Sequence, residues 1–305
     1  MQLLVTGGRG VRGVRTIRLA RARGPRVRVF DAVDDRIQVA AAVGAEASDL
    51  GWTVGDVVEA GAVSRAVAGA DAIIHFAGVM TTDCRKDPVR GAKIDLIGAL
   101  NVFRAALDHG VGRLAWASSA AVFAPDDGRQ PRPITHYGAY KLAAEACARA
   151  HFLEDGLSSV AFRPAIVYGP GREAGLTADP SRAVGDVLAG RPARIGWRGP
   201  TGFVHVDDVA EAFLAAIERS PVGAHAFNLG GEVASAEAFA AELARQSPGA
   251  RIAVEGDPLP LAADLAADDL DAVLPGLPHT SLVDGIARTI AELRADGLAA
   301  AAGAS

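Results

Sequence analysis

Apolar and polar residues alternate along the first half of the chain in two different rhythms. Short runs rich in β-branched residues are followed by longer stretches in which apolar residues recur every three or four positions, as on an amphipathic helix. This succession predicts βαβ units, and therefore a parallel sheet covered by helices. The predicted strands span residues 2–6, 26–31, 52–55, 72–76, 113–118 and 159–167, and the predicted helices span residues 11–23, 34–43, 89–109 and 137–154.

The alternation becomes less regular after Pro170, where glycine and proline are frequent. We therefore expect a first domain over residues 1–170 and a smaller lobe over residues 171–297 that shares elements with it. The last residues, 298–305, are alanine-rich without an apolar face, and we expect a frayed tail there. The elements predicted after Pro170 are strands at 203–206 and 226–229 and helices at 207–219, 235–245 and 281–296.

Composition narrows the class of protein. The 305 residues are 50% hydrophobic and 22% charged, which is typical of a globular chain and argues against disorder. No apolar run approaches the roughly 18 residues of a membrane span, and no signal peptide fits before the first strand, so we expect a cytoplasmic protein without a membrane partner. Cys84 and Cys147 lie far apart, so we expect neither a disulfide nor a metal site.

The charge distribution has one unusual segment. The chain carries a net charge of -5, yet eight arginines fall between positions 9 and 28. A nucleic-acid site would combine such a run with stacking aromatic residues and a basic domain, and neither is present. We therefore expect a helix face whose charges are solvated, and no nucleic-acid partner. Arg9 and Arg12 are a separate case, because they lie within a glycine-rich loop.

That loop reads TGGRGVRG and follows the first predicted strand directly. Glycines at positions 7, 10 and 13 permit a tight turn, a close approach of the backbone to a pyrophosphate, and close packing of the following helix. The helix N-terminus adds N–H donors and a partial positive charge. The sequence thus predicts an α/β, Rossmann-type doubly wound parallel sheet that binds a dinucleotide, with contacts from Gly7, Arg9, Gly10, Val11, Arg12 and Gly13.

The choice of dinucleotide depends on three charged residues. Asp31 ends the second predicted strand, where a carboxylate accepts both hydroxyls of an adenosine ribose and repels a 2′-phosphate, which favours NAD. Arg9 and Arg12 leave NADP open, since a guanidinium near that ribose can pair with the additional phosphate. Asp56 is either a contact to the adenine or a simple turn residue, and His75 is expected to be a satisfied core histidine.

The candidate catalytic residues lie further along. Ser119 follows a predicted strand, and Tyr137 and Lys141 stand four positions apart on one face of a predicted helix. An ammonium close to a phenol lowers the phenol pKa from its usual value of about 10. A phenol tuned in this way can exchange a proton with a carbinol oxygen while a hydride moves to or from a nicotinamide. Ser119 would donate a hydrogen bond to the same oxygen.

Seven motifs together resemble the extended short-chain dehydrogenase/reductase group, of the NAD-dependent epimerase/dehydratase type. They are TGGRGVRG, DAIIHFAG, GALNVFRAA, SSAAVF, YGAYK, RPAIVYGPG and FVHVDDVAEA, and the resemblance covers roughly residues 2–295. The resemblance implies that Tyr137 is the acid/base, that Lys141 holds the nicotinamide ribose, and that Ser119 orients the substrate oxygen. It places Asp56 and Val57 at the adenine, Ala77 and Gly78 in the cofactor channel, Pro164 and Val167 at the nicotinamide, and Asn101 near the catalytic groups.

The same resemblance implies a homodimer formed through the helices at 89–109 and 137–154. It also matches Asp207 and Asp208 to an acidic pair before a late helix, and helix capping is a sufficient structural explanation for these two residues. The chain departs from the family's pattern at Arg12, Tyr140 and Phe123, where apolar, small and tyrosine residues are usual. A dehydratase is disfavoured, because alanines at 120 and 121 replace the Asp-Glu pair that follows the catalytic Ser or Thr in such enzymes.

Two reactions remain open on the sequence. The first is hydride transfer at a carbinol or ketone of a sugar or sugar-like metabolite with free exchange of NAD(P), and we favour it. The second is epimerisation of a nucleotide sugar with retained NAD, but Gly202 stands where many sugar-nucleotide enzymes carry a diphosphate-binding arginine. Thr81, Thr82 and Arg172 are candidate substrate contacts, and Arg182, Arg194 and Arg198 are further substitutes for the missing arginine. A cofactor-sensing protein without turnover is the third hypothesis.

Overall fold

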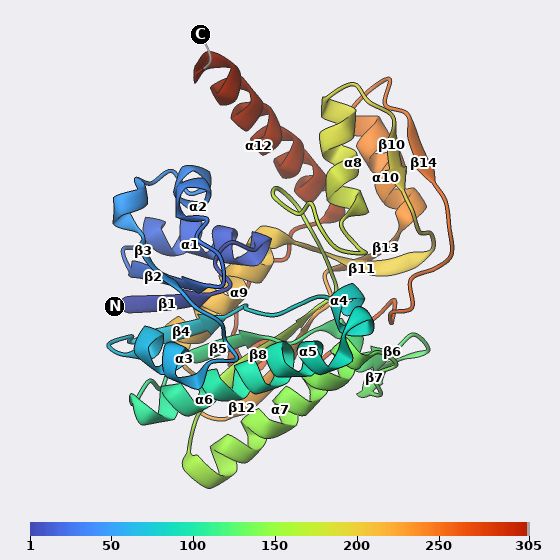
Figure 1. The fold of residues 1–305 in the computed structure, drawn as a ribbon. Coiled ribbons are helices and arrows are strands. Elements are labelled where there is room, and N and C mark those ends of the chain that lie inside the picture. Colours follow the sequence, from blue (N-terminus) through green and yellow to red (C-terminus); the bar gives the residue numbers. More distant parts are fainter. Residues whose placement is uncertain (304–305) are drawn as a thin grey trace.

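The computed structural model describes the backbone of residues 1–303 and the side chains of residues 1–296. Seven parallel strands form a central sheet in the order β12-β8-β5-β4-β1-β2-β3, which confirms the predicted doubly wound sheet (Figure 1). The strand order reverses between β1 and β4, so a crevice opens at their carboxyl ends. The strands are β1 (Gln2–Thr6), β2 (Arg26–Asp31), β3 (Gly51–Val54), β4 (Ala72–His75), β5 (Leu114–Ala117), β8 (Ser159–Pro164) and β12 (Ala224–Leu229).

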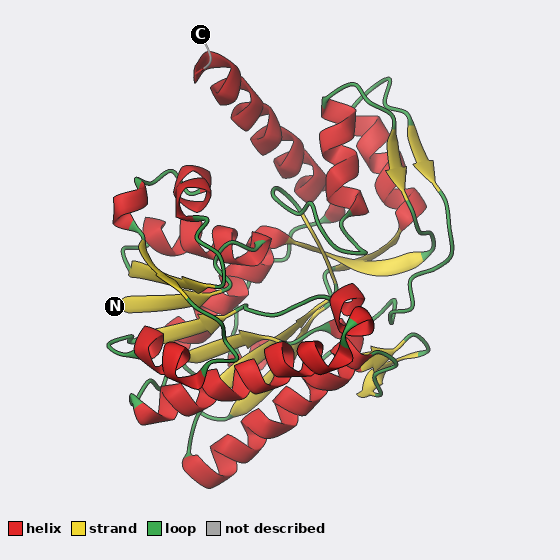
Figure 2. Cartoon of the chain, in the orientation of Figure 1, coloured by secondary structure: helices red, strands yellow, loops and turns green. Residues whose placement is uncertain are grey.

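Helices cover both faces of this sheet (Figure 2). Leu3, Val5 and Val29 point to one face and pack against the first helix group, whereas Leu4 and Phe30 point to the other, as expected for strands with a period of two. On the first face lie α1 (Val11–Ala22), α2 (Arg36–Ala42) and α9 (Val206–Arg219). On the second lie α3 (Ala60–Val67), α6 (Gly98–Asp108) and α7 (His136–Asp155).

The predicted strand at 159–167 is two strands in different sheets. β8 ends at Pro164, and after Ala165 the chain continues as β9 (Ile166–Tyr168), which pairs with β11 (Pro200–His205) instead of the central sheet. Pro164 has no N–H to extend the ladder, so the chain can leave the sheet at this point. β8 and β9 therefore connect the central sheet to the C-terminal lobe.

That lobe packs around its own apolar core, which includes Tyr168, Phe203 and Phe239. The chain does not remain in the lobe after Pro170, because α9 and β12 return to the central sheet. Its helices are α8 (Asp179–Leu188), α10 (Ala236–Gln246) and α12 (Leu282–Gly303), and its strands are β9, β11, β13 (Glu232–Ser235), β10 (Ala193–Ile195) and β14 (Ile252–Val254). α12 runs into segment 298–305, where we expected fraying, and residues 304 and 305 lie outside the described residues.

Short elements complete the fold. The single helix predicted at 89–109 consists of α5 (Pro88–Ala92), a π-helical turn η2 (Lys93–Ile97) and α6. No helix in the described part of the chain is long and apolar enough to cross a membrane. The remaining elements are α4 (Thr81–Lys86), α11 (Leu270–Val273), the 3₁₀ turns η1 (Ala47–Asp49) and η3 (Ala120–Val122), and the hairpin β6 (Phe123–Ala124) and β7 (Asp127–Pro131).

The arginine-rich helix is not a uniformly solvated face, and that expectation was wrong. Arg15 is buried and its Nε donates to Asp207 Oδ1 at 2.7 Å, while its guanidinium also pairs with Glu292. Arg18 pairs with Glu292 at 2.7 Å. Since Asp207 lies on α9 and Glu292 on α12, the positive residues of α1 serve to join it to two later helices.

Candidate active site

Two adjoining hollows open at the carboxyl ends of the central strands. The first is a groove that runs over the glycine loop and the ends of β1, β2 and β4. The second is a partly open cavity between the central sheet and the C-terminal lobe, with a volume of about 110 Å³. Of the residues predicted from the sequence, the groove is lined by Gly7, Arg9, Gly10, Val11, Arg12, Gly13, Asp31, Asp56, Val57, Ala77 and Gly78. The cavity is lined by Thr81, Thr82, Ser119, Tyr137, Pro164, Val167 and Arg172, together with Val11 and Arg12.

The glycine loop has the geometry that a dinucleotide requires. Gly7 has a φ of 68°, and a Cβ on it would lie 2.6 Å from the backbone nitrogen of Ala77. A Cβ on Gly13 would lie 2.6 Å from the carbonyl oxygen of Gly7. Any side chain at these two positions would push the loop away from the strands and the helix N-terminus into the groove. The residues present therefore fit a bound pyrophosphate at the start of α1.

Asp31 lies at the far end of the groove and is largely buried. Its Oδ2 accepts a hydrogen bond from the backbone N–H of Arg9 at 3.2 Å, and burial raises the pKa of this carboxyl. The Arg9 guanidinium is engaged elsewhere, with its Nε 2.8 Å from Asp35 Oδ2. Arg12 lies over the ring of Phe76, with 5.7 Å between the guanidinium carbon and the ring centroid. Both arginines thus have other contacts than a ribose phosphate.

The loop after β3 is held in place by Asn101 on α6. Asp56 is exposed, and its Oδ1 accepts from Val58 N at 3.0 Å, so it forms the turn that was one of its two predicted roles. Val57 and Val58 direct their carbonyl oxygens to the Asn101 amide nitrogen, at 2.8 and 3.1 Å. Asn101 therefore supports this loop. The expectation that Asn101 lies near the catalytic groups stays a prediction.

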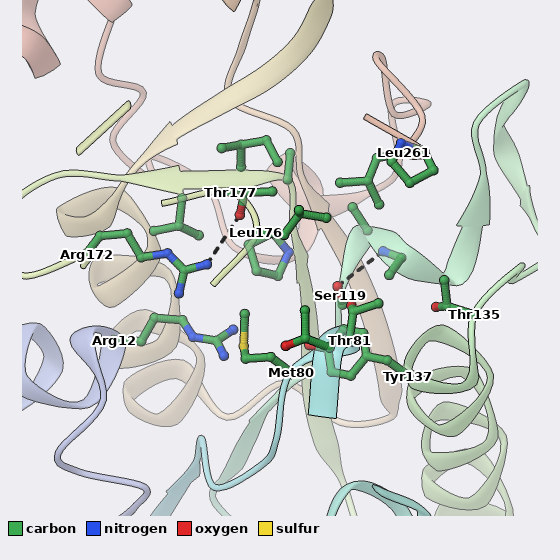
Figure 3. Close-up of a pocket in the computed structure, with 18 of the residues that line it drawn as sticks. Arg12, Met80, Thr81, Ser119, Thr135, Tyr137, Arg172, Leu176, Thr177 and Leu261 are labelled. Carbon is green, nitrogen blue, oxygen red and sulfur yellow. Dashed lines mark hydrogen bonds between the residues drawn. The ribbon is translucent and has the colours of Figure 1, made fainter. Parts of the chain in front are cut away.

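Tyr137 and Ser119 line the cavity (Figure 3), and Lys141 lies behind Tyr137, outside the lining of both hollows. Thr135 caps α7 by accepting from Gly138 N at 3.0 Å, which places Tyr137 in the first turn. Lys141 Nζ lies 5.6 Å from the centroid of the Tyr137 ring, and both side chains are buried. Ser119 Oγ accepts from Ala121 N at 3.2 Å. Its hydroxyl hydrogen can therefore be directed into the cavity beside the tyrosine.

The sequence did not reveal Asp95, the residue that contacts Lys141. Asp95 is fully buried in the π-helical turn η2, and its Oδ1 lies 3.2 Å from Lys141 Nζ. The same carboxylate accepts from Val79 N at 3.3 Å and from the Cys84 thiol at 3.3 Å. The available signal was a lone charge among apolar neighbours, in the run Ile94-Asp95-Leu96-Ile97. A buried carboxylate of this kind requires a cationic partner, and Lys141 supplies it.

Other buried polar groups have structural partners. His75 is the satisfied core histidine that we expected, because its Nδ1 lies 2.7 Å from Thr6 Oγ1 and burial lowers its pKa to about 3. Both cysteines are free, and burial next to Asp95 raises the pKa of the Cys84 thiol to about 12. The N-cap of α9 is His205 and not the acidic pair. Asp208 accepts instead from the backbone and hydroxyl of Thr280, each at 2.7 Å.

The departures from the family's pattern also have local contacts. Tyr140 donates its hydroxyl to the carbonyl oxygen of Pro88 at 2.9 Å and so joins α7 to α5. Phe123 is buried under the Arg163 guanidinium, 5.3 Å from the ring centroid, and Arg163 in turn pairs with Glu145 at 2.5 Å. These two residues therefore support the walls of the site.

Of the four arginines considered as substitutes for a diphosphate anchor, only Arg172 lines the cavity. Its Nη2 donates to Thr177 Oγ1 at 3.3 Å, and its Nε is buried without a partner in the described structure. Burial and, secondly, the positive charge of Arg12 lower its pKa to about 10. The other three have different partners: Asp179 for Arg182, Glu255 for Arg194, and the carbonyl oxygen of Val254 for Arg198.

The sequence profile of the NAD-dependent epimerase/dehydratase family matches residues 3–230. The chain belongs to this family. The match covers the central sheet almost completely, from β1 to β12, and includes Ser119, Tyr137 and Lys141. As a member of this family, the protein uses NAD. This agrees with the prediction that Asp31 favours NAD over NADP.

Individual relatives show the range of this family. UDP-glucose 4-epimerase 4 of Oryza sativa subsp. japonica is 27% identical over 75% of this chain and 71% of its own. 2-Alkyl-3-oxoalkanoate reductase of Stenotrophomonas maltophilia is 31% identical over 56% of this chain and 52% of its own. The solved UDP-glucose 4-epimerase of Thermus thermophilus in complex with NAD is 25% identical, covers 96% of this chain and 99% of its own, and superimposes with a TM-score of 0.79. These relatives include both epimerases and reductases. The protein is therefore an enzyme of this NAD-dependent family.

Proposed function

We propose that the protein transfers a hydride between nicotinamide and a carbinol or ketone of a sugar or sugar-like metabolite, with Tyr137 as acid/base. The observation that carries this proposal is that Tyr137 and Ser119 line one cavity beside the glycine-loop groove, with the Lys141 ammonium next to the Tyr137 ring. A proton donor at the substrate oxygen and a hydride acceptor at the substrate carbon must lie on neighbouring sides of the same small space. The two adjoining hollows supply that arrangement.

Each residue has a distinct task in this scheme. When bound, NAD accepts or returns the hydride. Tyr137 removes or returns the proton of the substrate oxygen, and Ser119 donates a hydrogen bond to the charge that develops there. Lys141 holds its ammonium beside the Tyr137 ring and stabilises the deprotonated phenol, while Asp95 fixes the position of that ammonium. Asp31 binds the adenosine ribose, and Gly7, Gly10 and Gly13 accommodate the pyrophosphate.

Epimerisation of a nucleotide sugar with retained NAD is the second candidate, and the names of relatives favour it. The C-terminal lobe argues against it, because a side chain at Gly202 would collide with the carbonyl oxygen of Gly230. An arginine that binds a diphosphate therefore has no room at this position. Dehydration is disfavoured as well, since the residues after Ser119 are Ala120 and Ala121 and place no acid at the cavity.

The decisive variant is Tyr137→Phe, which removes one hydroxyl and leaves the ring in place. We expect turnover of the native substrate to fall by about 10²–10⁴-fold, the usual contribution of a positioned acid/base, with nearly unchanged NAD binding. Unchanged turnover would overturn the proposed mechanism. Absence of turnover in both proteins, with intact NAD binding, would instead support a cofactor-sensing role.

A second measurement separates the two reactions. The purified protein is denatured, and the released nucleotide is identified and quantified by mass spectrometry. We expect a site that exchanges NAD freely and is largely empty after dialysis. Stoichiometric retained NAD would favour the epimerase, and bound NADP would contradict the role proposed for Asp31.

We also propose a homodimer formed through the helices at 89–109, which are α5, η2 and α6, and the helix at 137–154, which is α7. These helices expose large apolar side chains, among them Val89 on α5 and Leu153 on α7, which are 67% and 66% exposed. Light scattering after size-exclusion chromatography is expected to give twice the mass of one chain. A Leu153→Glu variant should shift the distribution to the monomer, because it places a charge in the proposed interface.

A further inference from the structure

Two arginine side chains end in the cavity without an acidic partner. Arg12 comes from the first turn of α1, and Arg172 comes from the loop that follows β9 in the C-terminal lobe. Within residues 1–296, the polar contact of Arg172 is the Thr177 hydroxyl, and Arg12 rests on the Phe76 ring. Figure 3 shows their guanidinium groups at one end of the cavity, with Ser119, Thr135 and Tyr137 at the other.

This arrangement is unfavourable without an anion. Both side chains are partly buried, and Arg172 Nε has lost contact with water without gaining a hydrogen bond. A buried donor left without an acceptor costs about 1–3 kcal/mol, and more when the group is charged. Two adjacent positive charges also repel one another. An oxyanion between the two guanidinium groups would satisfy both forks at once.

The size of the cavity indicates that the anion and the reacting carbinol belong to one small molecule. The cavity offers about 110 Å³ and opens on one side, so the part of the substrate that occupies it is small. A molecule that bridges the arginines and Tyr137 would carry an anionic group at one end and a carbinol at the other. The rest of the lining is largely apolar and includes Met80, Leu176 and Leu261.

The pyrophosphate of NAD is the other possible anion, since both arginines also border the groove. The loop glycines and the N-terminus of α1 already suffice for that group. Arg172 moreover belongs to the lobe, and it lies on the substrate side of the sheet domain.

We propose that Arg12 and Arg172 bind a carboxylate of the substrate, so that the substrate is a small hydroxy acid, including a sugar acid, or the corresponding keto acid. This inference rests on the proposed function for the identity of the reacting group. It is tested by binding, which does not require turnover.

The test uses protein saturated with NADH, in which a hydroxy acid cannot be oxidised. Glycerate and 3-hydroxybutyrate are titrated by calorimetry, each beside its neutral amide. We expect at least one acid to bind about 30-fold more tightly than its amide, because a charged partner within a desolvated pair contributes 2 kcal/mol or more. Arg172→Gln and Arg12→Gln should each remove this preference and leave amide binding unchanged.

Arg182→Gln is the matched control, because Arg182 pairs with Asp179 outside the cavity, and it should behave like the native protein. Equal binding of acids and amides, or no binding of either acid, would overturn the inference. Weaker NADH binding in the Arg12 and Arg172 variants, with an unchanged acid preference, would assign the pair to the cofactor pyrophosphate and overturn it as well. Failure of the proposed acid/base mechanism would be recognised separately, because turnover would then survive in Tyr137→Phe.

Discussion

Lys141 and Asp95 form a buried ion pair, with 3.2 Å between Nζ and Oδ1 and at most 7% of either side chain exposed. The two residues are on different elements, α7 and the π-helical turn η2. The widened turn brings a carboxylate to a lysine that would otherwise be a single charge in a buried position. Because Lys141 also faces the Tyr137 ring, the pair connects the stability of the fold to the geometry of the site.

We predict that Asp95→Asn lowers both stability and turnover. The amide keeps the volume and one acceptor but leaves the Lys141 charge without a buried partner, which costs about 3–5 kcal/mol of unfolding free energy. We expect a large fall in kcat and little change in KM, because the proposed mechanism has Lys141 act through Tyr137 on the chemical step. Urea denaturation and steady-state kinetics measure the two effects.

The matched control for that variant is Asp108→Asn. Asp108 also pairs with a cation, Arg104, at 2.9 Å, but both side chains are largely exposed. We expect a change within about 0.5 kcal/mol and unchanged kcat. Equal effects of the two substitutions would contradict a special role for the buried pair.

His75 should make the protein lose stability in acid. Its folded-state pKa is lowered to about 3, mainly by burial, whereas an unfolded histidine titrates near 6.5. Below pH 6.5 the unfolded chain binds a proton that the folded chain does not, so the free energy of unfolding falls as the pH falls towards 3. The slope contributed by this residue is at most about 1.4 kcal/mol per pH unit.

Urea denaturation between pH 7 and pH 4 measures this slope in the native protein and in His75→Asn. We expect a smaller slope in the variant, which has no titratable ring at this position. If the native and His75→Asn curves ran parallel, other groups would account for the acid sensitivity.

Arg15 should be the most important arginine of α1 for stability. Replacing it by Met keeps the apolar stem but leaves Asp207 and Glu292, both largely buried, without their shared cation. We expect a loss of about 3 kcal/mol in the free energy of unfolding. Arg18→Met, which removes a 47% exposed side chain from the same Glu292, should cost no more than about 1 kcal/mol. The prediction fails if the order of the two effects is reversed.

Gly202 should tolerate no side chain. A Cβ at this position meets the carbonyl oxygen of Gly230, which is backbone and cannot rotate away. Gly202→Ala is therefore expected to cost about 3 kcal/mol or more. Gly185→Ala is the same chemical change in the middle of α8, with nothing near the added methyl, and it should stabilise by about 0.5–1 kcal/mol. A stable Gly202→Arg protein with gained affinity for nucleotide diphosphates would contradict the argument against a sugar nucleotide.

Local patterns in the sequence predicted the candidate catalytic residues and most of the central sheet. The strand and helix rhythm identified β1, α1 and β2, because each element buries one face and so repeats at its own period. The glycine loop and the pair Tyr137 and Lys141 were recognisable because their residues are neighbours in the chain. Asp31, at the end of β2, was found for the same reason.

Only the tertiary structure decided which distant residues meet. Arg15 and Asp207 are 192 positions apart, and no local pattern indicates that they pair. The departure of the chain from the central sheet after Pro164 depends on the pairing partners available to β8 and β9. Asp95 reaches Lys141 because a π-helical turn rotates it inward. Arg12 and Arg172 were each recognisable in the sequence as single charges, but only the packing of the lobe against the sheet brings both to one cavity. The physical reason is that the energy of a buried charge depends on the partners that the fold places around it.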